Sequence, residues 1–170
     1  MAHLEEPPAT LGHPDELLDA YLDFYRDTVL RKIDGLSEQE LRGSRLPSGW
    51  TPLAMIVHLT WVERRWFGWG FAAEPTEQPW GDQGADGAWS VPAGDSVADV
   101  RAAFVAQCAR SRAIVAGVPL DQRAATGGRF ATAAETPALA WIKFHVLQEY
   151  ARHAGHLDIV RELADGVVGE

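Results

Sequence analysis

Residues 145–156 read His-Val-Leu-Gln-Glu-Tyr-Ala-Arg-His-Ala-Gly-His, and this stretch carries most of the information about the fold. On a helix of about 3.6 residues per turn, its metal-capable side chains fall on one face. They are His145, Glu149, His153 and His156. Apolar residues fall on or beside the same stripe, namely Ala138, Ile142, Ile159, Val160 and Leu163. The pattern predicts a helix that packs this face against other helices. Imidazole and carboxylate groups are costly to bury there unless something binds them, and a metal ion is the simplest candidate.

Four segments combine helical apolar spacing with helix start signals, and they cover about 14–33, 51–69, 96–117 and 136–164. Pro14 with the acids after it opens the first, and a Thr-Pro pair opens the second and the fourth. Ser96-Val-Ala-Asp99 has the form of a capping box and opens the third. Nothing reads as a convincing strand. We therefore expect an all-α protein, an antiparallel-type four-helix bundle.

Two long connections separate the last three predicted helices. Residues 70–95 are rich in Gly, Pro, Asp and Trp, and residues 118–135 contain Thr126-Gly127-Gly128-Arg129-Phe130. Loops of this length are often functional. The first could wall a pocket at the mouth of the bundle with Trp80 and Trp89, or it could be a poorly ordered surface insertion. Both interpretations stay open.

The composition is that of a globular protein, with 46% apolar and 23% charged residues among 170. We expect one domain over 1–170, with 1–13 as an N-terminal tail. A net charge of −9 argues against a nucleic-acid or anionic-membrane surface. No secretory signal or membrane span is recognisable. The single cysteine, Cys108, excludes an intramolecular disulfide and fits a reducing cytoplasm, and its helical spacing predicts burial.

Spacing alone leaves several metal sites open. His145/Glu149, Glu149/His153 and His153/His156 could each bind one ion, whereas all four residues span too much of the helix to share it. A third ligand has to come from another helix, and His58, which lies among apolar neighbours in segment 51–69, is the best candidate.

Two motifs carry a resemblance to a known family. His58-Leu-Thr-Trp-Val-Glu-Arg-Arg-Trp-Phe67 and Glu149-Tyr-Ala-Arg-His-Ala-Gly-His-Leu-Asp158 resemble the DinB-like superfamily, and more closely its actinobacterial branch, which includes mycothiol-dependent enzymes. The resemblance covers nearly the whole chain, including the helix order and the long connection after the second helix. It implies a DinB-like four-helix bundle.

The resemblance also implies a ligand set. In the family pattern one His of the second helix and two ligands at i and i+4 of the fourth hold a metal, and His58, Glu149 and His153 occupy those places. Many members have His where this chain has Glu149; a Glu there is similar to the His-Glu-His zinc site of mycothiol-dependent maleylpyruvate isomerase. His156 aligns with a Gln of the common pattern, and His145 lies one turn before the ligands. Both become candidates for binding a cofactor.

The function expected from this resemblance is that of a divalent-metal enzyme, a transferase or isomerase that activates mycothiol or another small thiol for a small-molecule substrate. Zinc is the first expectation, with nickel, manganese or iron as alternatives. A hydrolase that uses bound water and a non-catalytic, metal-binding dimeric bundle are the other interpretations. The resemblance implies a homodimer. No catalytic residue is assigned.

The arginines and acids near the motifs leave further alternatives. Arg65 lies two turns beyond His58 on the same face, and it could bind a carboxylate of the cofactor or substrate. The favoured alternative is a structural ion pair with a fourth-helix acid, Asp158 or Glu162. Glu63 belongs to a set of charges expected to be solvated or interhelical.

Overall fold

A computed structural model describes residues 4–168 of the chain, and within them it is helical. The elements are α1 (Pro14–Lys32), α2 (Glu38–Arg42), α3 (Pro52–Glu63), the π-helical segment η1 (Arg64–Phe71), α4 (Val97–Val115) and α5 (Leu139–Asp165). These residues form no strand, and their extended pairing is confined to isolated bridges between Gln83 and Trp89 and between Arg123 and Ala138. The expectation of an all-α protein is confirmed.

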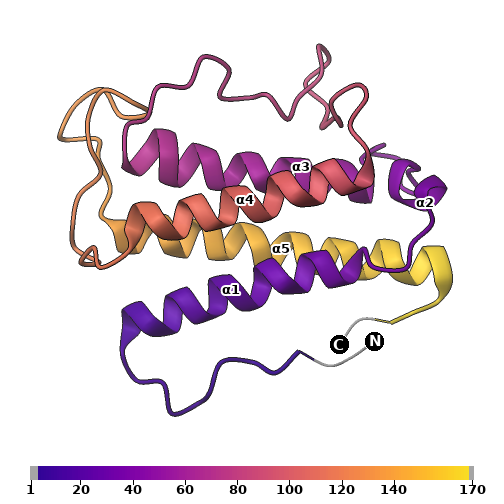
Figure 1. Cartoon of the computed structure of the whole chain (residues 1–170), viewed down its shortest axis with the longest axis horizontal. Helices are drawn as coiled ribbons and strands as arrows, with labels where there is room; N and C mark the ends of the chain where they lie inside the picture. The colour runs from indigo at the N-terminus through magenta and orange to yellow at the C-terminus, as the bar shows by residue number, and fades with distance from the viewer. Residues whose placement is uncertain (1–3, 169–170) are drawn as a thin grey trace.

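The long helices α1, α3, α4 and α5 lie side by side (Figure 1). Helices α1 and α5 run in the same direction, because Asp19 pairs with Lys143 at 2.6 Å near one end and Lys32 pairs with Asp158 near the other. Helix α4 runs opposite to α1: its Arg101 and Arg112 lie 2.8 Å from Asp34 and Asp23, respectively.

Helix α3 also runs opposite to α5, since His58 contacts His153 while Trp66, just beyond α3, contacts Trp141 at the start of α5. Neighbours α3 and α4 are therefore parallel, and residues 72–96 return along the molecule to join them (Figure 1). The arrangement thus contains parallel pairs of neighbours, which an antiparallel-type bundle does not predict, and α3 and α4 can be parallel because the connection between them is long enough to span a helix.

The predicted helix ends agree best with the structure where a local sequence signal determines them. Ser96 Oγ accepts a hydrogen bond from the Asp99 amide, and the Asp99 carboxylate accepts one from the Ser96 amide, as the capping box predicts. The last helix begins at Leu139 and not at Thr136, because the Thr136 hydroxyl binds Ala133 and Arg123 within the loop. The short α2 was not predicted, since five residues carry no periodic signal.

The buried face of α5 differs from the predicted stripe. It is centred on Leu139, Ile142, Val146, Tyr150, His153 and Leu157, whereas Ile159 and Leu163 are exposed. Of the four metal-capable residues only His153 is buried; Glu149 and His145 lie at the edge of the face, and His156 is exposed. No helix within residues 4–168 has the length and apolar character needed to cross a membrane.

Candidate metal centre

Three metal-capable side chains converge where α3 faces α5. His58 of α3 and Glu149 and His153 of α5 each offer a ligand atom, and these atoms lie within 4.8 Å of one another. The antiparallel contact of the two helices brings His58 to the i, i+4 pair on α5. The structure therefore brings together the three residues that the resemblance singled out.

His58 is held on both sides by the connection between η1 and α4. Its Nδ1 lies 2.8 Å from Oδ2 of Asp82, which is fully buried, and its ring stacks on Trp89 with centroids 3.9 Å apart. The carboxylate accepts a hydrogen bond from Nδ1–H, so the other ring nitrogen, Nε2, keeps its lone pair free. Burial lowers the pKa of His58, which favours the neutral form that a metal ligand needs.

Asp82 is fixed in turn by Arg65. The two guanidinium nitrogens Nη1 and Nη2 lie 2.7 and 3.0 Å from the two Asp82 oxygens, and Trp80 covers the guanidinium at 4.7 Å. Arg65 therefore makes a buried structural ion pair, but its partner comes from the connection and not from Asp158 or Glu162 of α5. Both tryptophans of this connection lie at the site, so it is not a loose insertion.

The path of the connection depends on a glycine. A Cβ on Gly81 would lie 2.2 Å from the Trp61 ring, so only glycine lets the backbone approach α3 this closely. Sequence reasoning missed Asp82, the residue next to this contact. The nearest sequence signal was Pro79-Trp80-Gly81, which marks a turn and an aromatic residue but does not indicate that the next carboxylate turns inward.

His153 and Glu149 interact directly. His153 Nε2 lies 3.2 Å from Glu149 Oε2, and His153 Nδ1 lies 3.3 Å from Nδ1 of His156. The hydrogen bond from His153, aided by Arg152, lowers the pKa of Glu149 to about 2. The carboxylate is therefore ionised at neutral pH, as metal binding requires.

The remaining sequence candidate, His145, lies beside the cluster. Its Nε2 is 3.7 Å from Glu149 Oε1, and its ring packs between Trp66 and Trp141. Burial lowers the pKa of His145 as well, so the imidazole is neutral near pH 7. His145 and His156 thus both contact a member of the cluster, His145 from the edge of the buried face of α5 and His156 from its exposed side.

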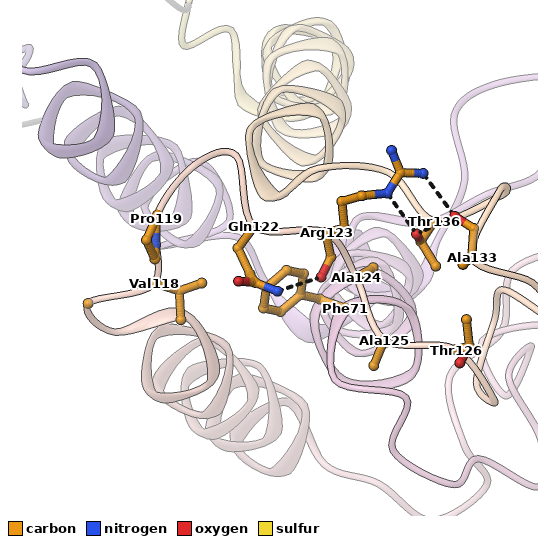
Figure 2. A pocket seen from close by; sticks show the side chains of 11 residues that line it. Phe71, Val118, Pro119, Gln122, Arg123, Ala124, Ala125, Thr126, Ala133 and Thr136 are labelled. Atoms are coloured by element: carbon orange, nitrogen blue, oxygen red, sulfur yellow. Dashed lines mark hydrogen bonds between the residues drawn. The ribbon is translucent and has the colours of Figure 1, made fainter.

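A separate hollow of about 800 Å³ lies where η1 ends against the connection from α4 to α5 (Figure 2). Phe71 lines it, and the Arg123 guanidinium points toward Thr136 and Ala133, to which it donates hydrogen bonds (Figure 2). None of the residues predicted for the metal site lines this hollow.

No curated protein matches the sequence. Residues 17–166 match the family model described as mycothiol S-transferase, which covers all the long helices except the first residues of α1. The cluster of His58, Glu149 and His153 lies within the matched region. Since the match spans most of the chain, the protein belongs to the mycothiol S-transferase family, a member of the DinB-like superfamily.

Proposed function

We propose that the protein is a metal-dependent transferase, built as a DinB-like four-helix bundle, which joins the sulfur of mycothiol or a similar small thiol to an electrophilic substrate. The observation that carries the proposal is the convergence of His58, Glu149 and His153 within 4.8 Å, in a chain of the mycothiol S-transferase family.

The donor set fits a divalent cation, with zinc as our first expectation. Two imidazoles and a carboxylate are a common set for catalytic zinc, in which one coordination position stays open to a ligand from solution. Asp82 on His58 and His156 on His153 are the kind of hydrogen-bond partners that orient metal-binding imidazoles. When bound, such a cation supplies positive charge that favours loss of a thiol proton near neutral pH.

The reacting thiol has to come from outside the protein. The only cysteine, Cys108, is buried beside Glu63 and Tyr150, and this environment raises its pKa to about 12. A buried thiol that stays protonated is a poor nucleophile.

The chain also offers a group that can hold the proton released by an external thiol. In the proposal this is His145, whose neutral imidazole lies next to Glu149, so that the protonated ring would face a carboxylate. The sulfur then forms its bond to the electrophilic carbon. In a substitution, the electron pair of the bond that breaks at this carbon departs with the leaving group; in an addition, the displaced pair stays on the acceptor.

Conjugation of mycothiol to a bromomethyl fluorophore tests the proposal, because the S–C bond forms as bromide leaves. We expect zinc-loaded protein to accelerate the reaction. We expect His58→Ala and Glu149→Gln each to lower kcat/KM about a hundredfold or more, because loss of a metal ligand costs more than loss of a group that only orients a ligand. His13→Ala and Glu162→Gln are matched controls, since both residues are exposed and lie outside the cluster.

Three results would contradict the proposed function or support an alternative to it. Wild-type turnover in Glu149→Gln contradicts the assignment of this cluster to the chemistry. Turnover that needs the metal but no thiol supports the hydrolase alternative. Unfolding on chelation, with no turnover of any electrophile, supports a structural metal.

A further inference from the structure

The connection from α4 to α5 is anchored on η1 by its backbone. The Ala125 amide donates to the Phe71 carbonyl at 2.9 Å, and the Arg129 amide donates to the Trp69 carbonyl at 3.1 Å. A Cβ on Gly128 would lie 2.2 Å from the same Trp69 oxygen, so this close approach requires glycine. The motif Thr126–Phe130 therefore places the Arg129 side chain at a defined position on η1.

The Arg129 guanidinium lies on tryptophan rings. Its Cζ is 4.2 Å from the centroid of Trp66 and 5.6 Å from that of Trp69, and the side chain is partly buried. Within residues 4–168 no carboxylate forms an ion pair with it, whereas Arg65, Arg110, Arg112 and Arg152 each have one. Burial and the positive charge of Arg65 lower the pKa of Arg129. An anion bound there would relieve that unfavourable environment.

The side chains of Trp66 and His145 lie between the Arg129 guanidinium and Glu149 of the candidate metal centre. The Trp66 ring beneath the guanidinium is 4.2 Å from the His145 ring, and His145 Nε2 is 3.7 Å from Glu149 Oε1. Trp141, which stacks on His145, is 52% exposed, so this aromatic cluster reaches the solvent. Because Trp66 is buried, the tryptophan surface open to a molecule that reaches from Arg129 toward Glu149 is that of Trp141, whose ring centroid lies 5.4 Å from that of Trp66.

We propose that Arg129 binds a carboxylate of the electrophilic substrate and so selects anionic acceptors. The proposal rests on the sulfur transfer proposed above. A guanidinium fork matches a carboxylate with two parallel hydrogen bonds, and the neighbouring rings suit a flat apolar body. The ligand is assigned to the electrophile because the thiol sulfur is placed at the metal ligands, so the second reactant has to occupy the space beside them.

A binding experiment tests the subsite without turnover. Quenching of tryptophan fluorescence measures the affinity of the full chain for benzoate and for the neutral benzamide, at equal zinc content in every variant. We expect Arg129→Met to bind benzoate about tenfold or more weakly than wild type, as expected for loss of a charged hydrogen bond, and benzamide equally. Arg45→Met is the matched control, because it removes an exposed arginine from the loop after α2.

The outcomes that overturn the proposal are equal benzoate affinity in wild type and Arg129→Met, or an equal loss in Arg45→Met. Arg129→Lys keeps the charge but not the fork, so we expect an affinity between those of wild type and Arg129→Met. If Arg129→Met does not fold, wild-type benzoate affinity in Arg129→Lys overturns the bidentate assignment.

A kinetic experiment separates the two reactants. With two electrophiles that differ only as a carboxylate and its methyl ester, we expect Arg129→Met to lower kcat/KM about tenfold for the carboxylate and to leave the ester and the KM for thiol unchanged. A rise in the KM for thiol alone overturns the assignment to the electrophile.

Benzoate binding through Arg129 without thiol turnover refutes the proposed function but keeps the subsite. Turnover with a carboxylate preference that survives Arg129→Met refutes the subsite alone.

Discussion

Asp82 and His156 each contact a ring nitrogen of a histidine in the cluster. Asp82 binds His58 Nδ1 at 2.8 Å, and His156 lies 3.3 Å from His153 Nδ1. In metal sites such contacts fix the tautomer and the ring orientation, and a carboxylate also makes the imidazole a stronger donor. Asp82 is the stronger of the two partners because it is fully buried and held by both arms of Arg65.

We expect Asp82→Asn to weaken zinc binding about 10–100-fold, because the amide keeps the size of the side chain but removes its charge from His58. A competition titration with a zinc-binding dye measures this. Asp86→Asn is the control: Asp86 is exposed in the same connection, and its Oδ1 accepts a hydrogen bond that an amide can keep. An unchanged dissociation constant in Asp82→Asn would show that Asp82 serves only Arg65.

At this scale the sequence predicts residues on helices better than residues in loops. Helical spacing placed Glu149 and His153 on one face but left other pairs open, and the family resemblance selected these two together with His58, which the structure brings near them. Asp82 could not be predicted, because it lies in an irregular connection whose path depends on close packing of Gly81 on Trp61. Arg65 was singled out correctly as an ion-pair residue, but its partner could not be identified for the same reason.

The segment η1 contacts both long connections. Asp82, which pairs with Arg65 of η1, belongs to the connection before α4, and the connection after α4 donates hydrogen bonds to the Trp69 and Phe71 carbonyls. Short π-helical segments occur often at functional sites. The sequence predicted a helix here but not its π form, since apolar spacing over eight residues does not distinguish the two. The helix starts at Pro14 and Ser96 could be predicted because a local signal determines each.

We expect Gly128→Ala to lower the free energy of unfolding by about 1–3 kcal/mol, because the added methyl group overlaps the Trp69 carbonyl and forces the loop away from η1. Urea denaturation followed by circular dichroism measures the change. Gly12→Ala is the control, since a Cβ there meets nothing within 4 Å. Equal stability of Gly128→Ala and wild type would mean that the loop is not held by this contact.

At the scale of the whole molecule, one buried carboxylate links the four long helices. Glu63 at the end of α3 is fully buried and pairs with Arg26 of α1 at 2.8 Å. Tyr150 of α5 donates to it at 2.8 Å, and the sulfur of Cys108 of α4 lies 4.0 Å away. Burial raises the pKa of Tyr150, so its hydroxyl remains a donor.

The four long helices and their order could be predicted from apolar spacing, whereas the short α2, the helix directions and this internal pair could not. Glu63 belonged to a set of charges expected to be solvated or interhelical. In the structure Glu63 is interhelical and fully buried. The sequence could not show this, because the apolar spacing of one helix does not reveal a charged partner on another.

We expect Glu63→Gln to cost about 3–5 kcal/mol of unfolding free energy, because it leaves Arg26 in the core without its main counter-charge. Urea denaturation measures the loss. Replacing both partners, as in Glu63→Gln with Arg26→Met, should recover part of it. Glu38→Gln breaks the exposed pair with Arg42 and should cost less than about 1 kcal/mol. A loss no larger in Glu63→Gln than in Glu38→Gln would contradict a structural role for this network.

The central claim is that His58, Glu149 and His153 hold one divalent cation, and elemental analysis of the purified full-length protein tests it most directly. We predict one equivalent of metal per chain in wild type and in His13→Ala, and a loss of that metal in His58→Ala and in Glu149→Gln, with circular dichroism to verify that each variant is folded. Wild-type protein that is folded but takes up no divalent metal, or a full equivalent retained in both cluster variants, would contradict the account.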